Sequence, residues 1–570
     1  MHKGVTATDM ATGTNNAFMK RIFAQRDSVV LGKNQPLAPR DRAQPADHRL
    51  MAHASGIVIT ALVTTFMSTF GNAQLLPTEP LRTDPLAQPV TAWRFTPQIN
   101  VTESFSDNPA LVPSADARKG WVTESTPGIR IEKNSVRSRI YVDYRLHDFR
   151  YASNARLNNS QRLLTSYATI QAIDNFFFVD ASANITQQNR SAFATAAATD
   201  VSGVNGNRIE TATNQISPYV RGSFSDIATY QLRVVGADIR SNDAVLPDTR
   251  GRQWTGFIKN EHAVSGFGWS VDGTAFSFRN SLVGKSYDER VRGSVSYEID
   301  SQIHVSAIGG HEATNLGGVQ NSRANTSGLG VEWSPGSRTQ FAAVREKRFF
   351  GYGHSLSFKH RTAQSAWSYK SSRDIVGPSG QLIATGLGST AGLLSDLLAS
   401  AIADPIAREA AVRRRLEESG ISANSASSGG FATGRPFLFR SDEASVALTG
   451  VYNTITLAVN RRDQRGFGPI IVGRDSFSLS NDIRQQGLNL NWIYRLSPLS
   501  SLSLIATYLR SEGLSVARLD SDQRSLNLLF STRIGVNTYL TFGARRVHFD
   551  NSLGTGYREN AVLGSISLRY

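Results

Sequence analysis

The sequence contains serine, histidine and acidic residues, the types from which hydrolases build nucleophilic sites, but their spacing does not favour such a site. His147 precedes Asp148, and His354 precedes Ser355. Neighbours along an extended strand point to opposite faces, so the members of each pair would not meet directly. The chain has no Gly-x-Ser-x-Gly elbow, no His-Glu-x-x-His motif and no phosphate-binding loop. We therefore predict that the protein is not an enzyme.

Cofactor and metal chemistry has equally little support. The chain has no cysteine, which excludes cysteine nucleophiles, disulfides and cysteine-ligated zinc or iron–sulfur sites. Residues 386–391 read Gly-Leu-Gly-Ser-Thr-Ala, which matches the loose dinucleotide-binding pattern, but no buried strand precedes them and no βαβ unit surrounds them. We predict a loop that enters a helix there, and neither a cofactor nor a metal.

Basic residues are the remaining candidates for chemistry. Lysine and arginine number 61 against 46 acidic residues, which gives a net charge of +15. The arginines are spread over many segments and no nucleic-acid-binding module is present, so we predict no nucleic-acid partner. Eight of them alternate with apolar residues along predicted strands, so we expect their side chains to face inward: Arg145, Arg290, Arg292, Arg462, Arg495, Arg533, Arg545 and Arg569. Arginines that line a pore favour anions. Alternatively, they pair with Asp143, Asp180 and Glu298 and simply fill the interior.

Most of the chain alternates apolar and polar residues. In residues 290–299 an apolar set alternates with a polar and charged one, and the apolar members are Val291, Gly293, Val295, Tyr297 and Ile299. The pattern recurs at 140–147, 488–496 and 540–545. Side chains of a strand alternate between its two faces, so each of these segments separates an apolar surface from a wet one. We count about 20–22 such strands on this criterion.

The connections between these strands alternate in length. Short polar turns such as Lys133-Asn134, Asp300-Ser301 and Ser497-Pro498 alternate with longer segments such as 189–209 and 465–477. Short turns on one side and long loops on the other are typical of an antiparallel up-and-down transmembrane β-barrel, whose strands need about 9 to 11 residues to cross a bilayer. We therefore predict an all-β barrel in contact with lipid in the bacterial outer membrane.

A soluble secreted β-sandwich or solenoid would also alternate, but two features favour the barrel. Tryptophans fall near strand ends, where an interfacial girdle would place them, as at Trp121, Trp269 and Trp367. No fixed repeat of about 20 to 50 residues is present, as a solenoid would require.

The end of the chain also alternates, up to a final aromatic residue. Ile566, Leu568 and Tyr570 lie on one face of this last segment. A closing strand that ends in an aromatic residue resembles the signal by which bacterial outer-membrane barrels are recognised for assembly. We therefore predict that these three residues form an assembly signal and that the barrel-assembly machinery is a partner.

The chain begins with segments that we expect to lie outside the barrel. Residues 57–70 are mostly apolar, too few for a membrane-spanning helix but enough for the hydrophobic region of a signal peptide. Small residues at Gly71-Asn72-Ala73 follow, so we predict a signal peptide at 51–73 that is cleaved after Ala73. Residues 1–50 do not fit this pattern, and a start at Met19 or Met51 is an alternative.

The mature chain is predicted to have two parts. Residues 74–91 contain four prolines and should form a periplasmic leader without regular structure. The barrel should then cover residues 92–570.

One helical insertion interrupts the barrel, at residues 374–434. Leucine and isoleucine recur in it at helical spacing, at Leu393, Leu394, Leu397, Leu398 and Ile402. Asp404-Pro405 supplies an N-cap and a first-turn proline for a second helix, and Gly420 ends it. If strand order is counted correctly, the insertion begins and ends on the extracellular side.

Three roles are open for this insertion: a surface loop on the barrel rim, a plug or constriction in the lumen, and a partner-binding element. A lumen enclosed by 20 or more strands is wide enough to leak unless something fills it. As a plug, the insertion would direct Arg408, Arg413, Arg414 and Arg415 toward acidic luminal groups or a passing anionic glycan, and its apolar stripe would anchor it.

Several strand and turn motifs resemble the outer-membrane β-barrel proteins associated with PEP-CTERM/exosortase systems. The resemblance spans roughly residues 92–570 and contains no catalytic motif. Its motifs are Thr96-Pro97 with residues 101–109, residues 126–129, Asp143-Tyr144-Arg145 with Tyr151, residues 217–220, and a block formed by 332–339, 348–351, 360–362 and 366–369.

The resemblance implies the outer membrane of a Gram-negative bacterium that makes an exported polysaccharide. The expected function is a conduit for exopolysaccharide export or an accessory to one, with the polysaccharide and periplasmic export proteins as partners. The alternatives are a general porin or small-solute channel, and a closed structural or receptor barrel, because all three require the same alternation.

Overall fold

The computed structural model describes residues 92–195, 206–225, 227–243, 246–260, 266–316, 322–377, 394–395, 397–399, 402, 405–419, 430–467, 475–515 and 519–570. The N-terminal extension, the predicted signal peptide and the predicted leader lie outside these residues.

The described residues form 22 strands. The first eleven are β1 (Arg94–Ser106), β2 (Gly120–Asn134), β3 (Ser138–Tyr151), β4 (Asn159–Ile173), β5 (Phe177–Asn189), β6 (Arg208–Phe224), β7 (Ala228–Ser241), β8 (Thr249–Asn260), β9 (Phe267–Asn280), β10 (Gly284–Asp300) and β11 (Ile303–Thr314). The other eleven are β12 (Ser322–Gly336), β13 (Thr339–Arg348), β14 (Gly351–Arg361), β15 (Ser365–Val376), β16 (Phe437–Thr449), β17 (Asn453–Gly466), β18 (Asp482–Arg495), β19 (Ser500–Gly513), β20 (Asp520–Arg533), β21 (Thr538–Asn551) and β22 (Tyr557–Arg569). Among the residues that the structure describes, three helical elements lie between strands: η2 (Ala155–Leu157), α3 (Pro405–Glu418) and α4 (Ser476–Leu479).

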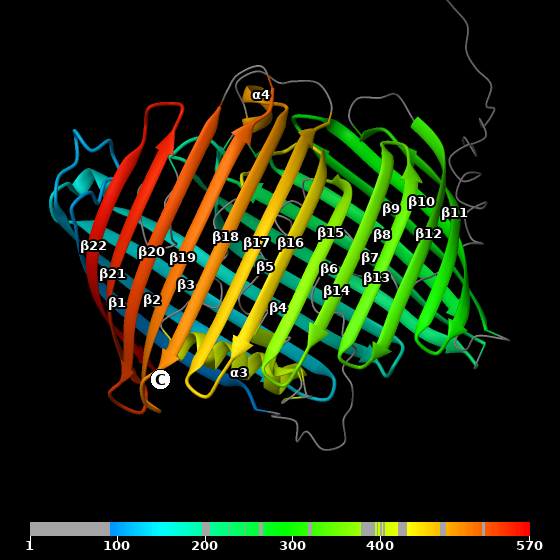
Figure 1. Ribbon diagram of the computed structural model, residues 1–570, viewed down its shortest axis with the longest axis horizontal. Coiled ribbons are helices and arrows are strands. Elements are labelled where there is room, and N and C mark those ends of the chain that lie inside the picture. Colours follow the sequence, from blue (N-terminus) through cyan, green and yellow to red (C-terminus); the bar gives the residue numbers. More distant parts are fainter. Residues whose placement is uncertain are drawn as a thin grey trace, which may run out of the picture. The chain divides into compact units, whose positions relative to one another are not determined.

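Each strand pairs antiparallel with the next along the chain, and β22 pairs with β1 to close the barrel (Figure 1). In that seam Ile566 lies opposite Val101, and the Tyr570 amide donates a hydrogen bond to the Pro97 carbonyl (3.0 Å). The predicted antiparallel barrel and its closing strand are confirmed, at the upper end of the expected strand number. Recognition of that strand by the assembly machinery stays a prediction.

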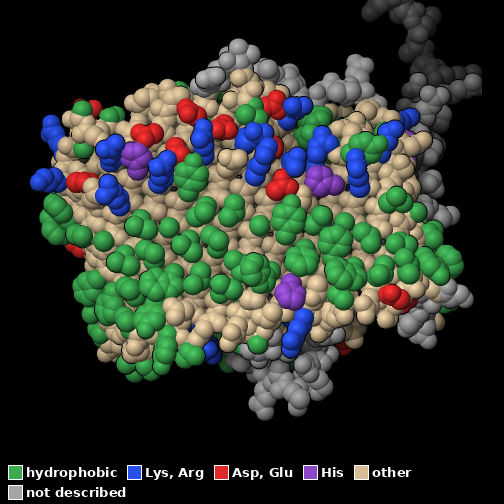
Figure 2. All heavy atoms as spheres, in the orientation of Figure 1, with side chains coloured by type: hydrophobic (Ala, Val, Ile, Leu, Met, Phe, Trp, Pro, Cys, Tyr) green, Lys and Arg blue, Asp and Glu red, His purple; other side chains and the backbone are tan. Residues whose placement is uncertain are grey.

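The outer wall carries a continuous apolar belt, which Figure 2 shows across the middle of the barrel. Trp121, Trp269, Trp333 and Trp367 contribute to the outer surface and are 40–51% exposed. Such side chains are costly in water and suited to lipid, whereas their strand neighbours point inward. The protein is therefore an outer-membrane barrel. No helix among the described residues is long and apolar enough to span a membrane.

The two rims of the barrel differ. On the rim that holds the start of β1 and the end of β22, the connections are mostly tight, as at the β4–β5 turn, where Asn175 takes a left-handed conformation (φ 55°). Longer connections lie on the other rim, including 107–119, 190–207 and the insertion between β15 and β16. In outer-membrane barrels the short turns face the periplasm and the long loops face outward. We call these the short-turn end and the long-loop end.

Candidate functional site: the lumen and its two closures

Buried ion pairs line one wall of the lumen. Arg292 on β10 bonds Asp272 on the adjacent β9 (2.7 Å) and Glu346 on β13 (3.1 Å). Because β11 and β12 lie between β10 and β13, the second contact runs across the inner surface of two strands. The Arg292 side chain is only 5% exposed. Removing one partner of such a pair leaves an uncompensated buried charge, which typically costs about 3–5 kcal/mol.

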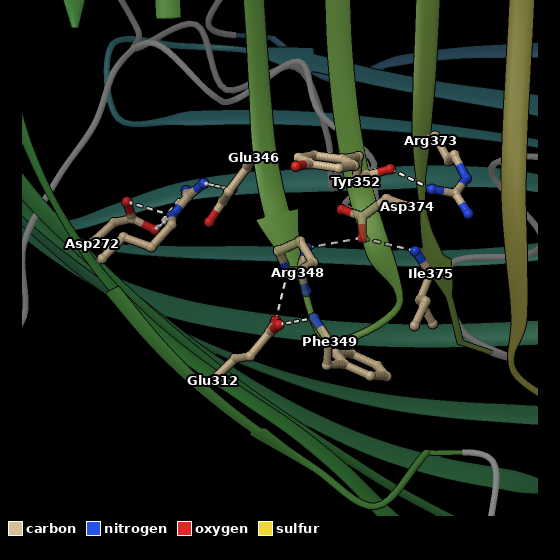
Figure 3. A network of polar contacts seen from close by, with 10 residues as sticks. Asp272, Glu312, Glu346, Arg348, Phe349, Tyr352, Arg373, Asp374 and Ile375 are labelled. Atoms are coloured by element: carbon tan, nitrogen blue, oxygen red, sulfur yellow. Dashed lines mark hydrogen bonds and ion pairs between the residues drawn. The ribbon is translucent and has the colours of Figure 1, made fainter. Parts of the chain in front are cut away.

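A second arginine continues this network on the same wall (Figure 3). Arg348, at the end of β13, bonds Glu312 on β11 (2.6 Å) and Asp374 on β15 (3.1 Å). The Glu312 carboxylate also accepts the Phe349 amide, and Asp374 accepts the Ile375 amide (2.8 Å). The network therefore joins strands β9 to β15 into one fixed inner surface.

The predicted pore-lining arginines fall into two groups. Some are paired with carboxylates in the wall: besides Arg292, Arg145 bonds Asp143 (2.8 Å) and Arg545 bonds Glu559 (2.7 Å). Arg290 is partly buried close to Arg292 and Arg348, and its Nε has no hydrogen-bond partner among the described residues. Pairing makes this wall far less cationic than its arginines alone suggest. Selection for anions by these residues stays a prediction.

The other predicted arginines are Arg462, Arg495, Arg533 and Arg569. Arg462 is buried within the wall on β17. The remaining three lie at the short-turn end: Arg495 is close to the charge of Arg415, Arg533 donates to the Gly535 carbonyl (3.0 Å), and Arg569 lies over the Tyr539 ring (5.1 Å). Arg533 therefore holds a turn at the rim.

The helical insertion leaves β15 at the long-loop end, but α3 lies at the opposite end of the lumen (Figure 1). Its contacts are with inward-facing residues close to the short turns. Arg413 bonds Glu132 near the end of β2 (3.2 Å) and lies over the Tyr141 ring of β3 (4.7 Å). Glu409 bonds Arg139 at the start of β3 and accepts from the Tyr167 hydroxyl of β4 (3.0 Å). α3 therefore does not lie on the extracellular rim.

The C-terminal end of α3 is held by a distant part of the wall. The last carbonyls of a helix have no partner within it and need one elsewhere. Ser501 and Ser503 of β19 supply hydroxyl donors to the carbonyls of Glu418 (3.1 Å) and Ser419 (3.0 Å). Arg415 donates to Thr454 on β17. Since the other contacts of α3 reach β2, β3 and β4, the helix lies between two separate sectors of the wall.

A small apolar cluster anchors the insertion. Leu394 and Leu397 pack with Val412 and Leu416 of α3. The wall contributes the inward-facing Ala366, Ala447 and Ile493. With the partly buried Leu398 and Ile505 included, the insertion contributes five side chains to this cluster and the wall contributes four.

The four arginines predicted for a plug have different surroundings. Arg413 faces acidic Glu132, as expected, whereas Arg408 donates to Ser395 (3.2 Å) and the Ile402 carbonyl (3.0 Å) within the insertion. Arg414 is exposed. Burial and the nearby charge of Arg495 lower the pKa of Arg415. A cation beside another cation weakens the hold of α3 on this part of the wall.

A second buried element, which the sequence did not predict, lies at the long-loop end. We call it the lid cluster: Phe193, Val376, Phe431, Phe437, Phe477 and Ile483. These residues come from three loops and the strands beside them. The segment 431–436, which returns from the insertion, is buried throughout. It is tied to β9 by Asn280, which donates to the Gly434 carbonyl (2.8 Å), and to α4 by Thr433, which donates to Asp475 (2.6 Å).

The outer wall brings together a histidine, a serine and an aspartate that are far apart in sequence. His354 Nε2 lies 3.0 Å from the Ser371 hydroxyl, which donates to Asp442 (2.6 Å). In a Ser-His-Asp triad the acid bonds the histidine and the histidine receives the serine proton. Here the acid bonds the serine instead, so the arrangement does not activate a nucleophile. His147, the other histidine considered, contacts Glu124 in the luminal wall (2.5 Å).

Within the described part of the chain, no group of three or more histidine and acidic side chains is placed to hold a metal ion. The candidate functional site is therefore the lumen itself: a fixed, ion-paired wall, α3 at the short-turn end and the lid cluster at the long-loop end.

Comparison with known proteins adds no family. No protein-family model and no curated protein sequence matches the chain. Among solved structures, the chain is similar to the siderophore receptor PirA from Pseudomonas aeruginosa, with 10% identity over 85% of this chain and 81% of that one and a TM-score of 0.38. It is also similar to the apoprotein form of the FrpB iron transporter from Neisseria meningitidis (8% identity, 85% and 82% covered, TM-score 0.45) and to OpdO from Pseudomonas aeruginosa (11%, 84% and 98%, TM-score 0.29).

Proposed function

We propose that the protein is a gated outer-membrane conduit that is closed at rest and serves exopolysaccharide export, either as the channel or as an accessory to one. The observation that carries the gated conduit is the position of α3, which enters from the long-loop end and contacts the wall at the short-turn end. The polysaccharide substrate rests on the sequence resemblance to PEP-CTERM/exosortase-associated barrels alone.

The size of the barrel supports a transport role for this helix. Barrels of 22 strands enclose a lumen that is plugged in known transporters, whereas 16- to 18-stranded porins leave an aqueous channel. A plug built from the chain itself has to move if a polymer is to pass. The contacts of α3 suit movement, because its ion pair to Arg139 is partly exposed.

The closed state also supports a second candidate, a structural or receptor barrel that never opens. Its support is the lid cluster, which closes the long-loop end with fully buried aromatic side chains. A small-solute channel is the third candidate, and it would require only a partial displacement of α3.

Deleting the gene from its host separates the three candidates. Export of polysaccharide predicts loss of surface polysaccharide in the deletion strain and recovery on complementation with the wild-type gene. Unchanged polysaccharide with altered permeability to small solutes would favour the small-solute channel. If both properties were unchanged, the barrel would be structural or a receptor, and the conduit proposal would be wrong.

A further inference from the structure

The outer wall carries charge in a band above its apolar belt. Figure 2 shows arginine and lysine side chains, with some acidic ones among them, on the side of the belt where α4 lies. That side is the long-loop end, so the band faces the outer leaflet and the cell exterior. Its side chains alternate with the luminal ones on the same strands. The charged side chains therefore point toward the membrane surface and not into the lumen.

Strand register aligns three arginines and one histidine of this band across neighbouring strands. Arg345 on β13 lies opposite His354 on β14, which lies opposite Arg373 on β15, which lies opposite Arg440 on β16. Neighbouring strands are about 4.8 Å apart, so these positions span roughly 14 Å. Lys347 lies opposite Tyr352, one outward position nearer the long loops. We call these five residues, Arg345, Lys347, His354, Arg373 and Arg440, the basic row.

The next strands carry the same band with its charges neutralised. On β17 to β20, Arg484 bonds Asp463 (2.6 Å), Arg510 bonds Glu512 (2.7 Å) and Arg524 bonds Asp522 (2.9 Å). Exposed pairs of this kind contribute little stability, but they leave no local excess of charge.

Among the described residues, one carboxylate contacts the basic row, and it already has two partners. Asp442 bonds Arg440 (3.1 Å) and accepts the Ser371 hydroxyl (2.6 Å). Arg345, Lys347 and Arg373 make no ion pair with any carboxylate of the described chain. Arg345 instead lies over the Tyr352 ring (4.6 Å), and Arg373 donates to the Tyr352 carbonyl.

Like charges placed opposite one another in a sheet are unfavourable unless something neutralises them. An excess of cations in this position therefore calls for an anion from outside the chain. Guanidinium groups match phosphate in geometry as well as in charge.

The surface beneath the basic row shows what kind of molecule carries that anion. On the same strands, the outward residues nearer the short-turn end are large and apolar: Trp367 and Tyr369 on β15 and Leu448 on β16 are 38–48% exposed. A ligand that fits both parts has anionic groups at one end and acyl chains at the other. In the outer leaflet of an outer membrane, the molecule with this chemistry is the lipid A part of lipopolysaccharide, a phosphorylated glucosamine headgroup that carries acyl chains.

We propose that the basic row binds the phosphate groups of the lipid A part of lipopolysaccharide, with the acyl chains lying against the apolar belt below. The proposal does not depend on what the lumen carries. Arg345, Lys347 and Arg373 supply the unneutralised charge, and Tyr352 holds two of them in place. A bound lipid here would cover the band on β13 to β16 and leave the paired band on β17 to β20 unaffected.

The test compares two triple variants of the full-length protein purified in detergent. The row variant is Arg345→Gln with Lys347→Gln and Arg373→Gln, and the control is Arg484→Gln with Arg510→Gln and Arg524→Gln. Both lose three positive charges from the outer band. The measurement is the affinity for bisphosphorylated lipid A, with heat-modifiable gel mobility as the check of folding. We expect the row variant to bind about 100-fold more weakly, since each basic side chain near an anionic lipid surface contributes about one kcal/mol, and the control to change much less.

Three results would overturn the proposal. The two variants could lose equal affinity for lipid A, or a folded row variant could keep the affinity of the wild type. The wild type could also bind dephosphorylated lipid A as tightly as the bisphosphorylated form. Displacement of lipid A by millimolar inorganic phosphate would assign the row to free anions and would also contradict it. If the triple row variant does not fold, Arg373→Gln alone should weaken binding about fivefold, and Arg373→Lys should retain most of it.

Discussion

The elements at the two ends of the lumen are held by different kinds of contact. At the long-loop end, Phe193, Phe431, Phe437 and Phe477 are at most 1% exposed. At the short-turn end, α3 is held largely by polar contacts, and in its pair with Arg139 the Glu409 side chain is 40% exposed. Burying a phenylalanine stabilises a fold by about 1.5–3 kcal/mol, whereas an exposed ion pair contributes about 0–1 kcal/mol. On this difference rests our proposal that α3 is the closure that can be released and the lid cluster is the fixed one.

Removing the releasable closure should have the largest effect. Deleting residues 380–430 takes away α3 and retains the segment that joins the lid cluster. We expect a folded barrel with several-fold larger single-channel conductance in planar bilayers, because α3 no longer lies between β3 and β19, and cells more sensitive to bulky antibiotics. Unchanged conductance in a deletion mutant with heat-modifiable mobility would mean that the lid cluster alone closes the lumen.

A change in the fixed closure should affect stability more than conductance. Phe477→Ala removes a ring that is fully buried in the lid cluster, and such truncations cost about 3–5 kcal/mol. We expect the long loops to become sensitive to protease added outside the cell, because the lid cluster then opens locally. Conductance should rise far less than in the deletion mutant, since α3 is intact. A rise equal to that of the deletion would make the lid cluster the gate and contradict the comparison.

The smallest effect should come from weakening α3 without removing it. Glu409→Gln eliminates the ion pair with Arg139, while the glutamine can still accept from the Tyr167 hydroxyl. A partly exposed pair contributes up to about 1 kcal/mol, so channel openings should become up to about fivefold more frequent. Asp148→Asn, which breaks a comparable pair with Arg150 on the outer wall, is the matched control. An equal increase in opening frequency in both variants would show that the Glu409–Arg139 pair does not hold the channel closed.

Much of the barrel was predictable because the membrane imposes a period of two on each strand. Lipid selects Val291 and Val295 on one face, and the lumen retains Arg290 and Arg292 on the other, so strand existence and facing can be read from a single chain. The helix was also predictable, because an N-cap, a first-turn proline and regularly spaced leucines are local signals.

What could not be predicted depends on register and on loops. Arg292 reaches Glu346 and His354 reaches Ser371 only because particular residues lie level on different strands. Phe193 and Phe477 lie in connections without periodicity, so nothing marked them as buried partners. The basic row could not be predicted for the same reason, since turns separate its members in the sequence and only strand register brings them side by side.

If α3 lies at the short-turn end of the lumen, a large reagent outside the cell cannot reach it. The chain lacks cysteine, so single cysteines can be introduced at two exposed positions, Arg414→Cys on α3 and Leu479→Cys on α4. Intact cells would be treated with a large poly(ethylene glycol) maleimide before and after permeabilisation of the outer membrane. We expect Leu479→Cys to be labelled in intact cells and Arg414→Cys only after permeabilisation. Equally fast labelling of both in intact cells would place α3 outside the short-turn end of the lumen, and α3 could not then be the releasable closure.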